Sequence, residues 1–442
     1  MTLATLLLAA AVQSQAYTLG SAVDLALGRS PDVRGAGLRV QEAEAALQEI
    51  RMKRLPSLAA NSAFTRGNNP VYVFGTLMGQ KSFTQANFDI YSLNNPSLTN
   101  NLRTSFDVGV PLFTGFELQS HERVGRLGRD AAASGQRAAE QNTRYAVVES
   151  FLQVLLQESL SKALADRIAA SEQEVESARK LKERGLVLGS DYYAALATLG
   201  GLKVWQTRVN AGLEAGKTKL AVLLGIPSQG LEVQGALSEK IPPLEAEAEL
   251  AGRALRERPE LRVSELKQDM ASVLRRQAGL SLSPKVEAFA SLETDTKDFD
   301  RNPWNRIFGV RASIPFGDPG YMPRRSKTQA ALEASRAELQ GMREIVSIEV
   351  GQLYQAYKGA RDSLPLSKDT LDKAKQSLDL FRPLYREGRQ SILEVLRAED
   401  GLAKAEAAYL ETLFALQAGR ARLLLAAGSL DDEAVRGMEE AK

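Results

Sequence analysis

Four short segments of the chain alternate apolar and polar side chains. They cover about 57–66, 103–112, 284–294 and 306–316. In the first segment, for example, Leu58, Ala60 and Phe64 alternate with more polar neighbours. A period of two predicts strands with one apolar face, and about ten residues also match the height of a membrane strand. The alternation alone fits a soluble sheet with one wet face equally well.

Around these strands the sequence predicts helices of unusual length. From Phe116 to Arg184 no proline occurs, and alanine, glutamate, glutamine, leucine and arginine dominate. At 1.5 Å per residue this helix is roughly 100 Å long. Further helices are predicted over 191–224, 325–387 and 391–427. Pro365 and Pro383 interrupt the helix predicted over 325–387, so kinks or a stacked pair of helices are expected there.

The last predicted helix carries a heptad pattern of large and small residues. The large residues recur every seven positions, at Val395, Leu402, Tyr409, Leu416 and Leu423. Small residues follow three positions after each, at Ala398, Ala405, Thr412, Gly419 and Ala426. The earlier counterpart, at Tyr192, Leu199, Gln206, Leu213 and Leu220, is less regular. The pattern predicts closely packed helices, and it does not separate the wall of a tube from an ordinary antiparallel coiled coil.

Glycine and proline landmarks indicate that the chain is a tandem duplication. Gly388 lies 203 positions after Gly185, and Gly428 lies 203 positions after Gly225. Pro259 lies 228 positions after Pro31, and Pro315 lies 204 positions after Pro111. One deletion of 24 residues between Pro284 and Pro315 accounts for the change. The predicted organisation is a first repeat over 17–225, a linker over 226–250, a second repeat over 251–428 and a tail over 429–442.

The first sixteen residues are typical of an export signal. Leu3 to Val12 is apolar and uncharged, and Ser14 and Ala16 provide the small residues that signal peptidase requires. A signal peptide over 1–16 is therefore predicted, with a buried N-terminal helix as the alternative. No later stretch holds about 18 consecutive apolar residues, so a membrane location would depend on the strands.

Charge and composition exclude several function classes. The 56 basic and 54 acidic residues nearly balance, which argues against nucleic-acid binding. His121 is the single histidine and there is no cysteine, so the commonest metal ligands and most nucleophile–base pairs are missing. No glycine-rich phosphate loop occurs. We therefore expect no enzyme activity, no cofactor and no metal site, and we place His121 on a helix surface near the strands.

Four strands cannot close a barrel, because about eight are needed. An open sheet edge is not tolerated in lipid, since its N–H and C=O groups would have no partner. If these strands lie in a membrane, the chain must therefore oligomerise. Two copies supply eight strands and three supply twelve, and the larger number leaves room for a conduit.

From about Tyr17 to Leu430, the duplicated order of helix, strand pair and helical hairpin resembles the TolC-type outer-membrane efflux family. The resemblance implies a mainly α fold with a membrane β part. It implies a homotrimer in which a twelve-stranded β-barrel in outer-membrane lipid continues into a helical tube across the periplasm. The expected partners are a periplasmic adaptor and an inner-membrane pump, which would supply the energy.

The same resemblance assigns roles to the two hairpin tips. It places adaptor docking at Gly185, Leu188, Gly189 and Asp191 of the first tip. In the second tip it places docking at Gly388 and Ser391. Glycine also suits a helix end because it adopts left-handed backbone angles at low cost, and Asp191 and Ser391 are suited to capping the returning helices. A purely structural role is the alternative.

The family also places a constricting ring of carboxylates just beyond the second tip. Glu394 matches its first position, whereas Arg397 stands where a second carboxylate is common. Three Glu394 side chains would favour cations and repel one another, and Arg397 would weaken that field or pair with Glu394 or Asp400. A solvated surface charge is the alternative for Glu394.

The resulting prediction is a passive outer-membrane exit duct, gated at its periplasmic end. The alternatives are a periplasmic coiled-coil adaptor or structural interaction protein without a pore, and a hydrolase. An adaptor would carry one hairpin, whereas this chain carries two, each after a strand pair. The sequence does not identify the exported substrate.

Overall fold

The computed structural model describes residues 15–298 and 303–439. The predicted signal segment 1–16 therefore lies almost entirely outside the described residues. The chain forms two compact units. Unit 1 comprises 1–39, 133–263 and 339–442, and unit 2 comprises 40–132 and 264–338. Several long helices supply residues to both units.

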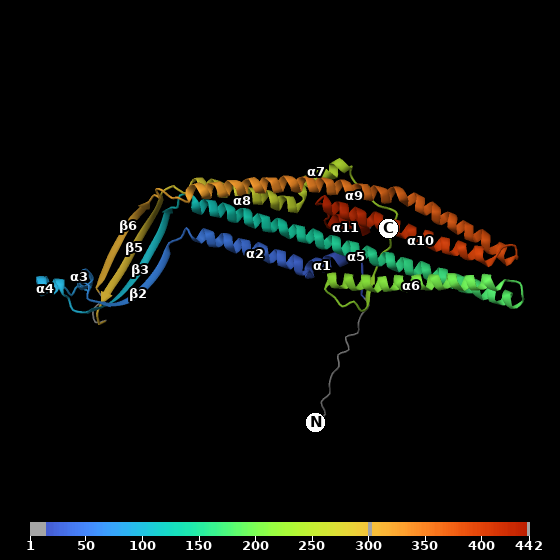
Figure 1. The fold of residues 1–442 in the computed structure, drawn as a ribbon, viewed down its shortest axis with the longest axis horizontal. Coiled ribbons are helices and arrows are strands. Elements are labelled where there is room, and N and C mark those ends of the chain that lie inside the picture. Colours follow the sequence, from blue (N-terminus) through green and yellow to red (C-terminus); the bar gives the residue numbers. More distant parts are fainter. Residues whose placement is uncertain (1–14, 299–302, 440–442) are drawn as a thin grey trace, which may run out of the picture. The chain divides into compact units, whose positions relative to one another are not determined.

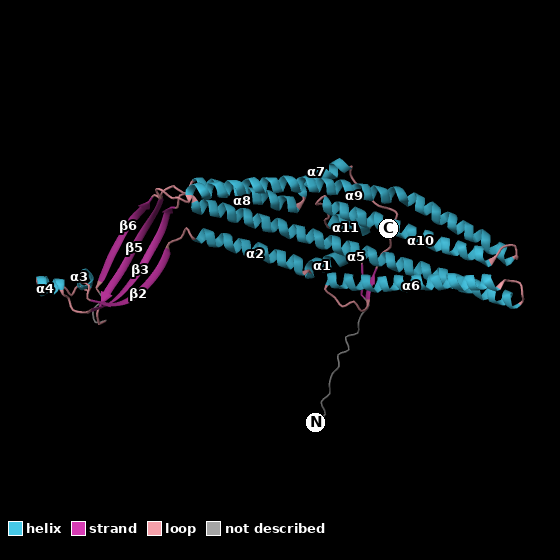
Figure 2. Ribbon diagram, viewed as in Figure 1, coloured by secondary structure: helices cyan, strands magenta, loops and turns pink. Residues whose placement is uncertain are grey.

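Unit 2 contains a four-stranded antiparallel sheet with the strand order β2-β3-β5-β6 (Figure 2). Its strands are β2 (Ser57–Gly67), β3 (Thr99–Phe113), β5 (Lys285–Thr296) and β6 (Trp304–Ser313). Each predicted repeat thus contributes two adjacent strands. The sheet is open, and within the described residues β2 and β6 each pair on one side only.

The register gathers the apolar positions of all four strands on one face. Leu58 pairs with Val108, Val108 with Ala290, and Ala290 with Phe308, and directly opposed residues share a face. Within this chain that face is uncovered, since Leu58 is 80% exposed and Phe308 is 84% exposed. The sheet therefore presents an apolar surface that needs a partner or lipid.

The opposite face of the sheet is polar, and on it the Asp107 carboxylate accepts hydrogen bonds from three side chains. Asn61 donates from Nδ2 to Asp107 Oδ2 at 2.9 Å, and Ser105 donates to the same oxygen at 2.8 Å. Ser291 of β5 donates to Asp107 Oδ1. These bonds tie three strands together through a carboxylate on the face opposite the apolar surface.

The connection between β2 and β3 contains secondary structure of its own. It folds into α3 (Pro70–Gly79), a 3₁₀ turn η1 (Gln85–Phe88) and α4 (Ile90–Asn94), and β3 begins at Thr99. Asn69 caps α3 by accepting from Tyr72 N at 3.1 Å. Edge-to-face contacts join Phe74 to Phe83 and Phe83 to Phe88, so the aromatic residues hold this segment in a defined structure.

The remaining elements are helices and two short strands. The helices are α1 (Leu19–Arg29), α2 (Pro31–Met52), α5 (Glu117–Glu183), α6 (Gly189–Leu224), α7 (Glu247–Glu257), α8 (Pro259–Gly279), α9 (Tyr321–Arg386), α10 (Ile392–Ala426) and α11 (Asp432–Glu439). In unit 1, β1 (Gln15–Tyr17) pairs in parallel with β4 (Leu231–Val233). Helix α11 and the two short strands are not predicted by the hydrophobic pattern.

One interpretation of the sequence expected the prolines to divide this segment into a stacked pair of helices. The structure has a single helix, α9, instead. The helix runs from Tyr321 to Arg386 with Pro365 and Pro383 inside it. Both prolines are exposed, so water can reach the carbonyl groups that lose a backbone donor. The chain therefore keeps one continuous helix despite two residues that normally end one.

Unit 1 is held by apolar packing along its hairpins. Four of the five large heptad residues in α10 are buried, and Tyr409 is half-buried. One apolar cluster joins α5, α6, α9 and α10. A second cluster includes residues of α1 and α11, and a third includes residues of α7. The heptad prediction of a closely packed α10 is confirmed.

Candidate functional site

The two hairpin tips lie at the same end of unit 1, where α5 turns into α6 and α9 turns into α10 (Figure 1). Helices α5 and α9 end in the same way. Gly185 and Gly388 have φ of 72° each, in the region that favours glycine. Each donates its backbone N–H three residues back, and the next residue donates five residues back. These paired bonds form a Schellman motif in each tip.

The two tips differ in how the returning helix begins. Ser391 caps α10 by accepting from Leu393 N at 3.2 Å, as the sequence predicts. The prediction that Asp191 caps α6 is wrong, because α6 already begins at Gly189 and Leu188 holds the cap position without a side-chain bond. Asp191 lies in the first turn instead, where a carboxylate is favoured by the helix dipole.

A hydrogen bond joins the two tips. Ser391 Oγ donates to Asp191 Oδ2 at 3.0 Å. The Ser391 hydroxyl therefore both caps its own helix and contacts the first turn of α6. Sequence reasoning assigned each residue to its own hairpin, because the residues lie 200 positions apart and no local pattern brings them together.

The first tip carries exposed apolar and cationic groups. Leu186 and Leu188 are each 70% exposed. Lys182 Nζ lies 4.7 Å from the centre of the Tyr192 ring and 4.8 Å from that of Tyr193, within the range of a cation–π contact. Gly189, the remaining residue predicted for docking, is the first residue of α6. Solvent-exposed leucines beside ordered aromatic rings give this tip a surface suited to protein contact.

Glu394 lies in the first turn of α10 and forms an ion pair with Arg397. Arg397 Nη1 is 2.8 Å from Glu394 Oε1, and both side chains are accessible. Asp400, the other carboxylate considered for Arg397, pairs with Lys404 at 2.6 Å instead. Glu394 stands six residues after Gly388, as Asp191 stands six after Gly185. The duplication therefore places one carboxylate at the same position of each hairpin.

A buried ionic cluster lies farther along the same hairpins. Glu399 of α10 is 0% exposed and is ion-paired with Arg382 of α9. Arg167 Nη1 of α5 lies 3.6 Å from Glu399 Oε2, and Arg382 Nε lies 3.7 Å from Glu174 Oε1. Burial raises the pKa of Glu399, and the two arginines oppose that shift. The heptad pattern gave no sign of this residue.

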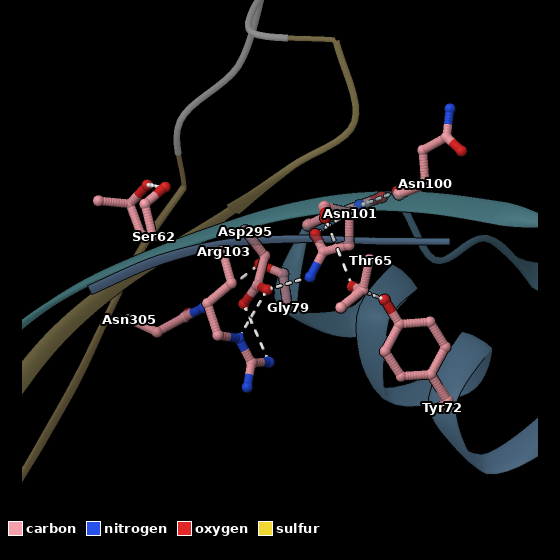
Figure 3. Close-up of polar contacts among 11 residues, drawn as sticks. Ser62, Thr65, Tyr72, Gly79, Asn100, Asn101, Arg103, Asp295 and Asn305 are labelled. Carbon is pink, nitrogen blue, oxygen red and sulfur yellow. Dashed lines mark hydrogen bonds and ion pairs between the residues drawn. The ribbon is translucent and has the colours of Figure 1, made fainter. Parts of the chain in front are cut away.

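At the end of the sheet next to α3, a second polar cluster holds the β2–β3 connection (Figure 3). Asp295 is buried and accepts from Asn101 Nδ2 and from Arg103 Nε, the latter at 2.9 Å. Gln80 Nε2 donates to Asn101 Oδ1 at 2.9 Å, and Asn305 Nδ2 donates to Gly79 O at 3.3 Å. The segment that follows α3 is thus fixed to β3 and β6.

His121 lies on the exposed surface of α5, as predicted. Its Nε2 is 3.2 Å from Gln277 Nε2 of α8. Across residues 15–298 and 303–439, no group of three metal-ligating side chains occurs. Over the same residues, none of the helices is both long and apolar enough to cross a bilayer.

The fold combines two strand pairs in one sheet with an apolar and a polar face, and each strand pair is followed by a long helical hairpin. Residues 22–219 and 250–429 match the family model described as outer membrane efflux protein. These residues make up most of the chain, and it belongs to that family. The protein is therefore an efflux protein of the outer membrane.

Known relatives resemble the chain over nearly its whole length. It is 24% identical over 438 residues to the probable outer membrane lipoprotein SilC of Salmonella typhimurium, covering 91% of this chain and 84% of SilC. It is also 24% identical to the cation efflux system protein CusC of Escherichia coli K12, covering 94% and 87%. A membrane protein from Pseudomonas aeruginosa shares the fold, with a TM-score of 0.80, 18% identity and coverage of 93% and 92%.

Proposed function

We propose that this chain is one subunit of a homotrimeric exit channel. In the trimer, three four-stranded sheets join into a twelve-stranded barrel in outer-membrane lipid, and the long hairpins form a helical tube. The observation that carries the proposal is the sheet itself, with its exposed apolar face and the free sides of β2 and β6. Lipid covers the apolar face, and only sister strands satisfy the edges.

The polar face of the sheet supports the same arrangement. In a closed barrel of alternating strands the face opposite the lipid lines the lumen. Asn61, Asp107 and Ser291 lie on that face and bond to one another. They provide a hydrated wall for solutes, and four strands from a single copy are too few to enclose one.

The hairpin tips are proposed as the docking site for a periplasmic adaptor, which links the channel to an inner-membrane pump. Leu186 and Leu188 offer exposed apolar anchors, and Lys182 is ordered against Tyr192 and Tyr193. Gly185, Gly388 and Ser391 set the shape of the two turns. A Leu188→Asp change should abolish cross-linking to the adaptor while the channel still assembles.

Glu394, Arg397 and Asp191 are proposed as the gate of the periplasmic entrance. Three copies bring six carboxylates from equivalent hairpin positions to one end of the tube. Each Glu394 is partly neutralised by Arg397, so the field at the entrance is weaker than that of carboxylates alone. Opening requires the tips to separate, which breaks the hydrogen bond from Ser391 to Asp191.

A pair of substitutions in β6 tests the channel assignment. Val310 lies on the apolar face and Arg311 on the polar face. An arginine or lysine on the lipid side of a membrane strand costs about 2–4 kcal/mol at mid-depth. Val310→Arg should therefore abolish the trimer in detergent extracts of outer membranes, whereas Arg311→Asp should keep the trimer.

Planar-bilayer recordings complete this test. The wild-type protein should form pores, and Arg311→Asp should alter their ion selectivity because it changes the charge of the lumen. A wild-type protein that is monomeric and water-soluble without detergent would refute the proposal. Since CusC is named a cation efflux protein, metal cations and organic toxicants should be compared as substrates in a deletion strain.

A further inference from the structure

Arg420 of α10 is a buried cation that lacks hydrogen-bond partners. Its side chain is 8% exposed, and its Nε and Nη1 atoms have no partner in the structure. No described carboxylate within residues 15–298 and 303–439 forms an ion pair with it. Burial lowers the pKa of Arg420, yet a guanidinium stays protonated in proteins. A charge held this way destabilises the fold unless something compensates it.

A small cavity in unit 1 lies next to this arginine. Its volume is about 40 Å³. Arg420 and Gln417 of α10 line it together with Phe151 and Leu155 of α5 and the segment 234–242. Gln417 Nε2 donates to Ser238 O at 3.1 Å, which holds that segment against α10. The cavity is therefore walled by three parts of unit 1.

Among the described residues that line the cavity, one carries a carboxylate, Glu439. Its Oε2 accepts from Gly20 N at 3.0 Å, and no hydrogen bond joins it to Arg420. The Nε and Nη1 donors of Arg420 are therefore left without an acceptor next to this cavity.

We propose that this cavity is a binding site for a small inorganic anion or a single carboxylate group, with Arg420 as its principal ligand. The volume admits about three water-sized positions, which fits chloride or formate and excludes a bulky organic anion. Water alone would supply acceptors but leave the charge, whereas an anion supplies both. Bound there, the anion joins α10 to segment 234–242 and stabilises the packing between them.

The first test is thermal unfolding of the purified protein in detergent, followed by circular dichroism. Sodium gluconate is replaced stepwise by sodium chloride at constant ionic strength. The melting temperature should rise with chloride and saturate, because the anion binds the folded state. Formate should act like chloride if the site accepts a carboxylate, and acetate tests the size limit. A melting temperature that does not change between gluconate and chloride would overturn the proposal.

The second test compares two variants of α10. Arg420→Gln should lose the chloride dependence, whereas Arg422→Gln removes an exposed charge two residues away and should keep it. Chloride-35 NMR gives an independent readout at a temperature where both variants are folded. Wild-type protein and Arg422→Gln should broaden the chloride signal through a saturable site that Arg420→Gln lacks. Equal dependence in both variants would show that Arg420 is not the ligand.

Discussion

Single side chains in this protein act across elements that are far apart in the sequence. Ser391 caps α10 and also donates to Asp191 of α6. Glu399 is buried between α5, α9 and α10, where Arg382 and Arg167 face it and Glu174 is nearby. Both residues connect the hairpins by polar contacts, so their effects should be measurable one residue at a time.

Glu394→Ala should change the pores formed by the protein. In the proposed trimer with Glu394 at its entrance, removing the carboxylate releases Arg397, so the entrance loses three negative charges and gains three unpaired positive ones. Cation selectivity in planar bilayers should fall, by an amount that shrinks at high salt because the charges are exposed. Lys404→Ala, which removes a pairing partner of Asp400 on the same helix, is the control. Equal selectivity in wild type and Glu394→Ala would make Glu394 an ordinary surface charge.

Glu399 should make the stability of the protein depend on pH in a definite direction. Burial raises the pKa of its carboxyl above 4.5 in the folded state, so the folded protein binds this proton more tightly than the unfolded chain does. The stabilising contribution is then present at low pH and is lost as pH rises through the folded pKa. Relative to Glu399→Gln, the wild-type melting temperature should therefore fall as pH increases from about 4.

Glu176→Gln provides a control of opposite sign. A hydrogen bond from Arg179 lowers the pKa of Glu176, so its contribution is lost as pH falls. The wild type should gain on this variant as pH rises. If the melting temperature of the wild type also rose relative to Glu399→Gln as pH increased, burial would not be what controls the pKa of Glu399.

At the scale of whole elements, the hairpin ends repeat while the sheet connections do not. Gly185, Gly225, Gly388 and Gly428 all have positive φ and paired Schellman bonds. The duplicated sequence predicts these breaks because left-handed geometry selects glycine at each copy. The connection from β2 to β3 folds into helices, by contrast, and its fold depends on aromatic and polar contacts.

Gly388→Ala should destabilise the second tip. Alanine pays roughly 1–2 kcal/mol for left-handed backbone angles, and no neighbouring atom would clash with its Cβ. Gly401→Ala in the same hairpin is the matched control, since Gly401 lies within α10 and its Cβ also meets open space. That change should stabilise by up to about 1 kcal/mol. Urea unfolding in detergent measures both, and similar effects of the two changes would exclude backbone geometry as the cause.

Asp295→Ala should loosen the β2–β3 connection. The change leaves Asn101 and Arg103 without their buried acceptor, and the contact from Gln80 to Asn101 weakens with it. Protease added to the purified protein in detergent should then cut within 80–98 faster than in the wild type. Asp298 is exposed and lies two residues after the end of β5. Asp298→Ala is therefore the control and should leave cleavage unchanged. Unaltered cleavage in Asp295→Ala would mean that the aromatic contacts alone hold the segment.

For the molecule as a whole, periodicity and duplication predict much of the fold. The strands follow from alternation and the long helices from proline-free stretches. The continuity of α9 did not follow, because exposure of Pro365 and Pro383 depends on packing. The burial of Glu399 and Arg420 was also not predicted, because a charged residue in a helix is normally assigned to the solvent-exposed surface when its tertiary neighbours are unknown. The predicted cap of α6, Asp191, lies three residues after the observed cap position, Leu188.

The free sides of β2 and β6 have a genetic consequence. In the proposed trimer, each copy must pair one free strand edge with each neighbour, so a single copy with a faulty edge leaves the barrel wall open. If mutant and wild-type chains are made in equal amounts and mix at random, only about one ring in eight contains wild-type chains alone. A substitution that spoils an edge should therefore be dominant, and toxicant sensitivity should appear even in cells that keep an intact gene.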